Sequence, residues 1–68
     1  MMYTGKDLEK RRIELNLSQK QIADMLQVDQ STVSRIENGL NDRLSLHIAY
    51  NGILNELEEG ENNGKEES

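Results

Sequence analysis

The stretch LSQKQIADMLQVDQSTVSRIENG, Leu17–Gly39, contains the start signals of two helices in close succession. Ser18 and Asp29 are the predicted N-cap residues. Each of them follows an apolar residue that can pack on the fifth residue after it, which is the spacing of a hydrophobic staple. Ser18 and Gln21 also match a capping box. The sequence therefore predicts two short helices, one beginning after each cap.

The connection between these two helices should be very short. The apolar spacing ends the first helix near Leu26, and Gly39 can take the left-handed conformation that ends the second. Only Gln27 and Val28 remain as the connection. Helices joined so tightly must cross at a steep angle, as in a helix-turn-helix, which we place at about residues 18–38.

Two further helical regions flank this motif. The staple spacing recurs in YTGKDL, Tyr3–Leu8, where Thr4 is the predicted N-cap. Residues 44–58 carry an apolar stripe with helical spacing. Gly52 interrupts that stripe, so the region can form one long helix or two short ones. The chain has no Pro and no strand-like alternation, and we predict an all-α bundle of four to five helices.

Composition excludes several classes of function. The 68 residues suffice for one small domain. There is no Cys, and the single His has no partner ligand, so disulfides and zinc sites are excluded. No apolar run suits a membrane span or a signal peptide, which favours a cytoplasmic protein. The sequence has no nucleophile–base pair, no carboxylate dyad and no phosphate loop. We therefore expect neither catalytic activity nor a bound cofactor.

The net charge of -5 is concentrated at the C-terminal end. Residues 1–55 carry seven basic and seven acidic side chains, whereas six Glu and one Lys follow from Glu56 onward. We therefore expect a helix-turn-helix domain at residues 1–59, which is neutral through residue 55, and an acidic, disordered tail at residues 60–68. Such a tail would weaken binding to DNA without preventing it, and we favour solubility over partner binding as its role.

The segment Leu17–Gly39, with likeness back through Arg12, resembles the lambda-repressor/Cro-like (XRE-type) helix-turn-helix family. The opening L-S-Q-x-x-[IL]-A and the ending S-x-[IV]-S-x-[IL]-E-N-G carry the resemblance. Proteins of this family bind operator DNA in the major groove, usually as dimers, and most regulate transcription. The C-terminal part is shorter here than the family's usual fourth and fifth helices. Gln27 stands where the family usually has Gly, which would cost about 1 kcal/mol at positive φ.

The resemblance also implies where DNA would be contacted. It places the recognition helix at about residues 30–38, with its polar face outward, and it places Gln19 near the phosphate backbone. It suggests that Arg12 and Glu37 form a semi-buried ion pair, whose disruption would cost several kcal/mol. The expected DNA-binding residues are Gln19, Lys20, Gln30, Ser31, Thr32, Ser34, Arg35, Asn38 and Arg43.

The residue types on the exposed side of the recognition helix suit a DNA groove. A Gln amide offers adenine a donor and an acceptor together, Arg can bind guanine bidentately, and Ser fits against a base or a phosphate. Helix N-termini supply further N–H donors to phosphates. Lys6 and Lys10 are additional candidates for phosphate contacts. The alternative is that this polar face is simply solvated, but the adjoining turn and the E-N-G ending favour DNA.

The apolar stripe in residues 44–58 is larger than three short helices can cover. Part of it should contact a second copy, because a symmetric operator requires two recognition helices. The alternative is that the whole stripe packs within the chain. The residues concerned are Leu44, Leu46, Ile48, Tyr50, Ile53, Leu54 and Leu57.

These observations favour a sequence-specific transcriptional repressor of phage or mobile-element type that binds a palindromic operator as a homodimer. The alternative is an antitoxin-like or antirepressor-partner module that grips another protein through its C-terminal helix. Phosphate contacts would make affinity fall steeply with salt, whereas a helix–groove contact between proteins would respond weakly. His47 is interpreted as a helix-surface or core-edge residue.

Overall fold

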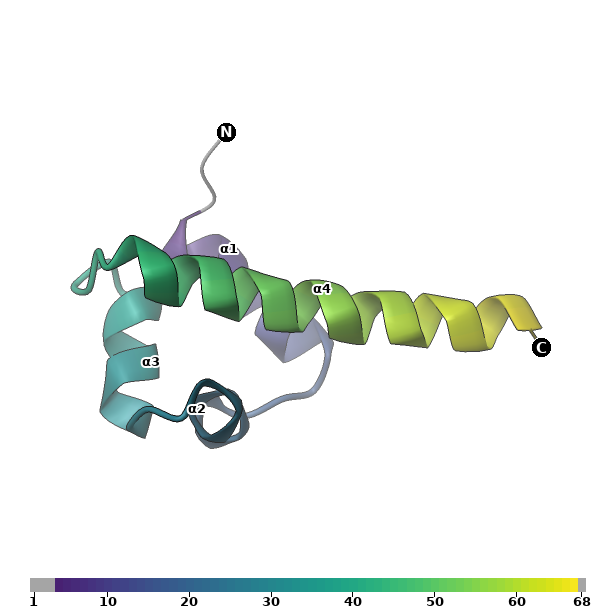
Figure 1. The fold of residues 1–68 in the computed structure, drawn as a ribbon, viewed down its shortest axis with the longest axis horizontal. Coiled ribbons are helices and arrows are strands. Elements are labelled where there is room, and N and C mark those ends of the chain that lie inside the picture. Colours follow the sequence, from purple (N-terminus) through teal and green to yellow (C-terminus); the bar gives the residue numbers. More distant parts are fainter. Residues whose placement is uncertain (1–3, 68) are drawn as a thin grey trace.

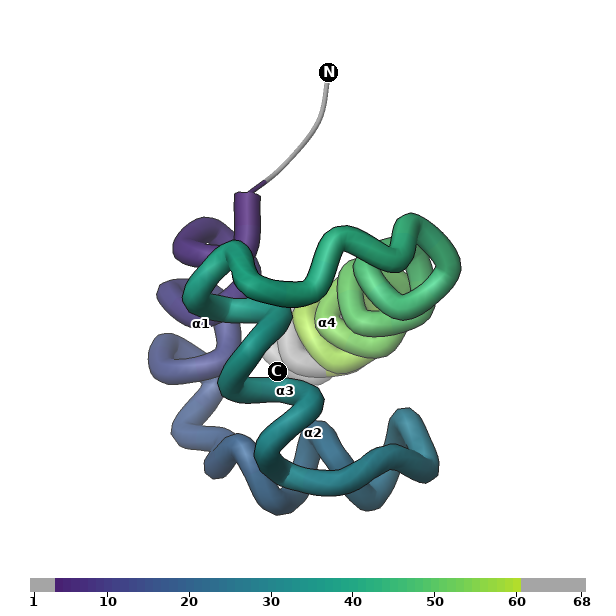
Figure 2. The backbone as a smooth tube through the Cα atoms, turned by 90° about the vertical axis from the view of Figure 1, so that its left-hand side faces the viewer, coloured from purple at the N-terminus to yellow at the C-terminus, as the bar shows by residue number. Residues whose placement is uncertain are grey.

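The computed structural model describes residues 4–67, with side chains described through residue 60. Within these residues the chain is all-α and has no strand, so the predicted fold class is confirmed. Helix α4 packs across α1 and α2, while α3 packs against the same two helices (Figure 1). Figure 2 looks nearly along α4, with α1 to one side of it and α2 below. The helices are α1 (Gly5–Glu14), α2 (Gln19–Leu26), α3 (Gln30–Glu37) and α4 (Leu44–Glu67).

Local capping signals fix the starts of the first two helices. The Thr4 hydroxyl accepts a hydrogen bond from the Asp7 backbone N–H at 3.2 Å, and the Asp7 carboxylate accepts one from the Thr4 N–H at 3.1 Å. Ser18 and Gln21 form the same reciprocal box before α2. Asp29 is the N-cap of α3, as predicted, but its side chain makes no capping hydrogen bond. Tyr3, the first staple residue, lies outside the described residues.

The turn between α2 and α3 is as short as predicted. Gln27 lies in the left-handed region, with φ 60° and ψ 43°. Its N–H donates to the Asp24 carbonyl at 3.2 Å, and the Val28 N–H donates to the Ala23 carbonyl at 3.0 Å. These bonds satisfy carbonyls at the end of α2. Figure 1 shows α2 end-on while α3 lies in the plane of the view, so the two helices cross steeply.

Because a side chain at positive φ is strained, Gln27→Gly should raise the free energy of unfolding by about 1 kcal/mol. Asn16 also has φ 60° and provides a matched control, since Asn tolerates this conformation better than Gln does. Asn16→Gly should therefore gain less. Urea unfolding followed by circular dichroism measures both changes. Equal effects at the two positions would contradict strain at Gln27.

All four helices contribute to one core. The partly buried Leu17 and Val28 pack against it, as expected for staple residues. Met25 of α2 is 46% exposed, although its spacing from Ile22 would suit an inward position. The eight-residue helix α2 contributes to the core through Ile22 and Ala23, which leaves Met25 on its flank. The fully buried apolar residues are Leu8, Ile22, Ala23, Val33, Ile36, Tyr50 and Leu54.

Helix α4 continues through Gly52 as one helix rather than two. Hydrogen bonds and an ion pair from Arg11, which were not predicted from the sequence, hold it to α1. The Arg11 guanidinium donates to the Oδ1 atoms of Asn51 (2.6 Å) and Asn55 (2.8 Å) and to both carboxylate oxygens of Glu58 (2.9 Å each). These contacts lie on both sides of Gly52 along the helix and support its helical conformation.

Two expectations concern parts of the chain beyond this core. Apart from Gly60, the acidic tail at residues 60–68 lies outside the residues whose side chains are described, so its disorder stays a prediction. Among the described residues, no helix combines the length and apolar character needed to cross a membrane.

Candidate nucleic-acid interface

Helix α3 presents one polar side to solvent because its other side is anchored in the core. Val33 and Ile36 are fully buried, and the side chain of Glu37 is only 1% exposed. Apolar residues three apart in a helix lie on the same face, so the residues between them turn outward. Of the residues expected to contact DNA, Gln30, Ser31, Arg35 and Asn38 are exposed, while Thr32 and Ser34 are half-buried.

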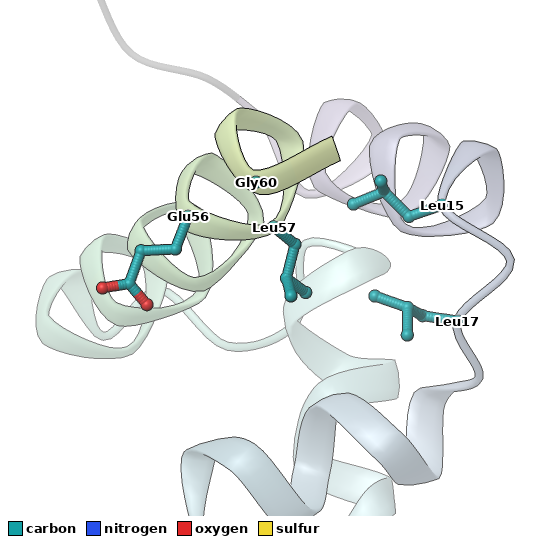
Figure 3. Close-up of a pocket in the computed structure, with 5 residues that line it drawn as sticks. All are labelled: Leu15, Leu17, Glu56, Leu57 and Gly60. Atoms are coloured by element: carbon teal, nitrogen blue, oxygen red, sulfur yellow. The ribbon is translucent and has the colours of Figure 1, made fainter. Parts of the chain in front are cut away.

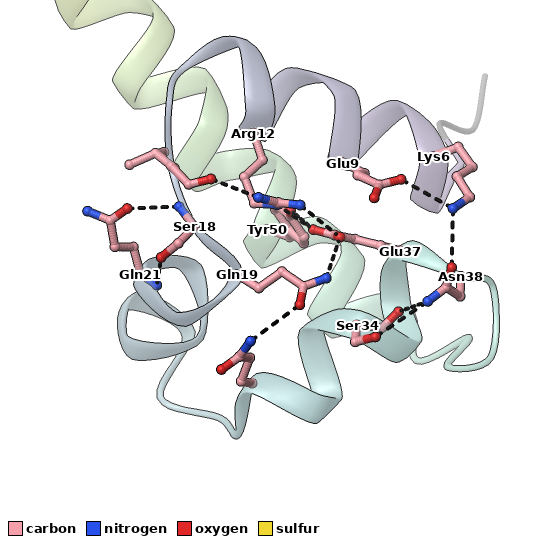
Figure 4. Close-up of polar contacts among 12 residues, drawn as sticks. Lys6, Glu9, Arg12, Ser18, Gln19, Gln21, Ser34, Glu37, Asn38 and Tyr50 are labelled. Carbon is pink, nitrogen blue, oxygen red and sulfur yellow. Dashed lines mark hydrogen bonds and ion pairs between the residues drawn. The ribbon is translucent and has the colours of Figure 1, made fainter.

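The expected residues at the start of α2 have different surroundings. Lys20 is exposed and lies 3.9 Å from the carboxylate of Asp24, a solvent-accessible pair that contributes little to stability. Gln19 is half-buried. Its amide nitrogen donates to Glu37 Oε1 at 2.9 Å, and its amide oxygen accepts a long bond of 3.5 Å from Gln30 Nε2. Gln19 therefore joins the buried side of α3 to its exposed side (Figure 4).

Asn38 is tied to α3 and to the start of α1. Its amide nitrogen donates to the Ser34 carbonyl at 2.9 Å and lies 3.4 Å from the Ser34 hydroxyl. The Lys6 ammonium donates to Asn38 Oδ1 and to Glu9 Oε1, at 3.2 Å in each case (Figure 4). Lys6 therefore lies beside the end of α3, a position that periodicity within α1 could not reveal.

Arg43 and Lys10 are not brought to α3 by any polar contact. Arg43 is exposed just before α4, and its backbone N–H donates to the Asn41 side chain at 3.0 Å. Lys10 is exposed on α1. Across the part of the chain with described side chains, no hydrogen bond or ion pair joins either residue to α3.

A buried polar network lies directly beneath this surface. Arg12 Nε donates to Glu37 Oε2 at 2.8 Å, and Arg12 NH2 donates to Glu37 Oε1 at 3.3 Å. Arg12 NH1 also donates to the Leu17 carbonyl at 2.7 Å. The Tyr50 hydroxyl donates to Glu37 Oε2, a contact that was not predicted from the sequence. The network ties α1, α3 and α4 together, and no buried side-chain polar atom among the described residues lacks a hydrogen-bond partner.

The environment of the network shifts the pKa values of its members. Burial alone would raise the pKa of Glu37, but hydrogen bonds from Arg12, Tyr50 and Gln19, with the charge of Arg12, outweigh it and hold this pKa below its ordinary value. Burial lowers the pKa of Arg12, but the contacts with Glu37 reverse the direction and raise it. Burial and the neighbouring carboxylate raise the pKa of Tyr50. At neutral pH, Glu37 is a carboxylate paired with a guanidinium.

The depressed pKa of Glu37 predicts a loss of stability in acid. An unfolded Glu titrates at about pH 4.3, so below that pH the unfolded chain binds a proton that the folded chain does not. The stabilisation is complete above this value and is lost as pH falls through the folded pKa. The hydrogen bond from Arg11 lowers the pKa of Glu58, so protonation of Glu58 in acid also reduces the free energy of unfolding. Urea unfolding at pH values from about 6 to 3 measures the slope.

Two variants separate the contributions to this acid dependence. Because the Glu58 side chain is still 35% exposed and solvent screens its charge, Glu58→Gln should remove only a small part of the slope. Glu37→Gln should be less stable at neutral pH and should lose most of the remaining slope. A Glu37→Gln variant with the full wild-type slope would show that other carboxylates cause the acid dependence.

Comparison with known proteins bears on the whole arrangement. A helix-turn-helix family model matches residues 8–50, which is more than half of the chain. The match begins at the buried Leu8 of α1, includes the turn between α2 and α3, and ends at the buried Tyr50 of α4. No significant match was found among curated proteins or among solved structures. The chain belongs to the XRE, lambda-repressor-like helix-turn-helix family of DNA-binding transcription regulators.

Proposed function

We propose that this regulator is a repressor of phage or mobile-element type that inserts α3 into the major groove of a palindromic operator. The observation that carries the proposal is the outward polar face of α3, held by the buried Val33, Ile36 and Glu37. Amide, hydroxyl and guanidinium groups on this face are the groups that read base edges. Occupation of the operator would exclude the polymerase.

The exposed residues of α3 differ in the hydrogen-bonding groups that they can present to DNA. Gln30 and Arg35 carry the bidentate groups suited to adenine and guanine, and Ser31 lies beside them at the start of the helix. The half-buried Thr32 and Ser34 have hydroxyls at the edges of this face. The proposed phosphate contacts come from Gln19, Lys20, Asn38, Arg43 and, from its position beside Asn38, Lys6.

We propose that a second copy of the chain packs against the exposed apolar residues at the start of α4. Tyr50 and Leu54 of the expected stripe are buried within the chain, but Leu44 and Ile48 are 60% and 55% exposed. Leu40, which follows α3, is 77% exposed. Burial of such side chains favours association, and a two-fold axis there would present two copies of α3 to a symmetric operator.

A protein-binding role is the second candidate, and one feature favours it. A shallow apolar groove of about 350 Å³ lies between the end of α1 and the second half of α4 (Figure 3). Such a groove can receive apolar side chains from another protein, as expected of an antitoxin-like or antirepressor-partner module. The lining residues are Leu15, Leu17, Glu56, Leu57 and Gly60.

A salt titration distinguishes the two candidates. When a protein neutralises Z phosphates, the logarithm of its affinity for DNA falls with the logarithm of salt concentration with a slope of about -0.9Z. We expect DNA affinity to fall by orders of magnitude between about 50 and 200 mM salt, as for proteins with several phosphate contacts. A flat dependence, or no DNA binding at the lower salt, would favour the protein-binding role.

Arg35 tests direct reading of the base sequence. Arg35→Ala should cost about 1–3 kcal/mol on the preferred site and relax the base preference at one position of each half-site. Lys20→Ala is the control, because loss of a phosphate contact weakens binding about equally on every sequence. Competition binding with single-base variants of the site measures both effects. An equal loss on all sequences for Arg35→Ala would make Arg35 a backbone contact.

A further inference from the structure

A chain of hydrogen bonds leads from the buried network to the exposed face of α3. Glu37 Oε1 accepts from the Gln19 amide nitrogen at 2.9 Å, and Gln19 Oε1 accepts from the Gln30 amide nitrogen at 3.5 Å. Glu37 is buried, Gln19 is half-buried and Gln30 is exposed. Figure 4 shows the hydrogen bond between Glu37 and Gln19 and the bond that continues from Gln19. It joins a core residue to a residue proposed to read DNA.

The first link has a fixed direction. An ionised carboxylate only accepts hydrogen bonds, so the Gln19 side chain must turn its N–H group toward Glu37. The contacts that hold the pKa of Glu37 low keep this carboxylate ionised at neutral pH. The Gln19 carbonyl oxygen is then left facing Gln30. An amide without such a partner could rotate so that its nitrogen and oxygen exchange places.

The hydrogen bond between Gln19 and Gln30 in turn fixes the orientation of the Gln30 amide. Because the Gln19 oxygen only accepts, Gln30 must offer it an N–H. The other N–H of Gln30 and its carbonyl oxygen remain free for a ligand. Adenine presents an acceptor and a donor side by side in the major groove, which this pair of groups matches. Fixing the amide before DNA arrives also reduces the conformational entropy lost on binding.

Both oxygens of Glu37 accept from Arg12, but their other partners differ, so the bond to Gln19 and the bond to Tyr50 can be tested separately. Oε2 accepts the shorter bond from Arg12, 2.8 Å, and the bond from Tyr50. Oε1 accepts a longer bond from Arg12, 3.3 Å, and the shorter bond from Gln19. We propose that Glu37 is a positioning residue for base recognition, which orients the Gln19 amide and through it the Gln30 amide toward adenine. This assignment rests on the proposed reading of DNA by α3.

A double-mutant cycle with Gln19→Met and Gln30→Met tests the chain. Gln30→Met defines the base pair that Gln30 reads, and affinities are measured for the four duplexes that differ only there. Gln19→Met should reduce the adenine preference about tenfold, the scale of one oriented base contact. In the Gln30→Met background, Gln19→Met should leave the relative affinities for the four duplexes unchanged, although loss of its proposed phosphate contact can weaken binding to all four equally. The assignment would be overturned if Gln19→Met leaves the adenine preference unchanged, or if it changes a base preference even without Gln30.

Glu37→Gln tests the start of the chain, because its amide can offer Gln19 an N–H or an oxygen. At a temperature where circular dichroism shows it folded, this variant should lose the adenine preference as Gln19→Met does. Tyr50→Phe is the matched control: it weakens the network at Oε2 but leaves the Gln19 bond, so the preference should remain. Full preference in folded Glu37→Gln would refute the role of Glu37. If Glu37→Gln does not fold, the Gln19→Met cycle decides: an unchanged adenine preference there refutes the assignment, because that variant removes the bonds of Gln19 to both Glu37 and Gln30.

Failure of the proposed function would look different from failure of this inference. A wild-type protein that prefers no base at any position would contradict reading of DNA by α3. If the wild-type protein has a clear base preference and Gln19→Met does not change it, α3 still reads DNA. Only the positioning role of Glu37 is then refuted.

Discussion

Replacing Gly5 by Ala should destabilise the fold by about 3 kcal/mol or more, because there is no room for a side chain where α1 meets α3. A Cβ at Gly5 would lie 2.1 Å from the Ile36 carbonyl oxygen and 2.9 Å from the Glu37 backbone. These neighbours are backbone atoms of a packed helix and cannot rotate away. The two helices would have to separate, which would also disturb the contact between Lys6 and Asn38.

Gly52→Ala is the matched control for this prediction. Nothing lies within 4 Å of a Cβ at Gly52, which is in the middle of α4. Ala is the better helix former, so this change should stabilise the protein by about 0.5–1 kcal/mol. Urea unfolding of the two variants should therefore give opposite signs. A Gly5→Ala variant as stable as the wild type would show that α1 does not approach α3 so closely.

Glu37→Leu should cost about 3–5 kcal/mol, because it leaves the Arg12 charge buried without its partner. It also removes the acceptor of the Tyr50 hydroxyl, which lies in the core. For a domain of this size such a loss is comparable with the whole free energy of unfolding. Thermal unfolding followed by circular dichroism should show a large fall in midpoint or no folded state.

A combined variant identifies the cause of that loss. In Arg12→Met with Glu37→Leu and Tyr50→Phe, apolar side chains replace all three polar partners, and such replacements of buried ion pairs are often neutral. The triple variant should be considerably more stable than Glu37→Leu alone. If it is equally unstable, the loss arises from packing at residue 37 and not from a stranded charge.

The parts of the fold that the sequence predicted correctly are those set by local interactions. Thr4 and Ser18 cap their helices through residues three positions away, and the left-handed turn at Gln27 is fixed by its neighbours. The continuity of α4 could not be predicted, because the cost of Gly52 is offset by contacts with Arg11, far away in sequence. The composition of residues 44–58 contains no sign of that partner.

The candidate interface divides in the same way. The outward side of α3 follows from the spacing of Val33 and Ile36, so the exposure of Gln30 and Arg35 was within reach of the sequence. The bond from Gln19 to the buried carboxylate of α3 depends on how steeply α2 and α3 cross, which packing determines. Arg43 is exposed before α4, and its position relative to DNA is determined by how the whole domain docks, which local sequence does not encode.

The most direct test of the central claim, that the outward face of α3 reads base sequence, is selection of bound duplexes from a random pool at low salt. We expect the purified protein to enrich one palindromic sequence with half-sites about one helical turn apart, and we expect Gln30→Met and Arg35→Ala each to lose preference at a defined position. If the pool stays random through repeated rounds, or if both variants select the same sequence as the wild type, α3 does not read the base sequence.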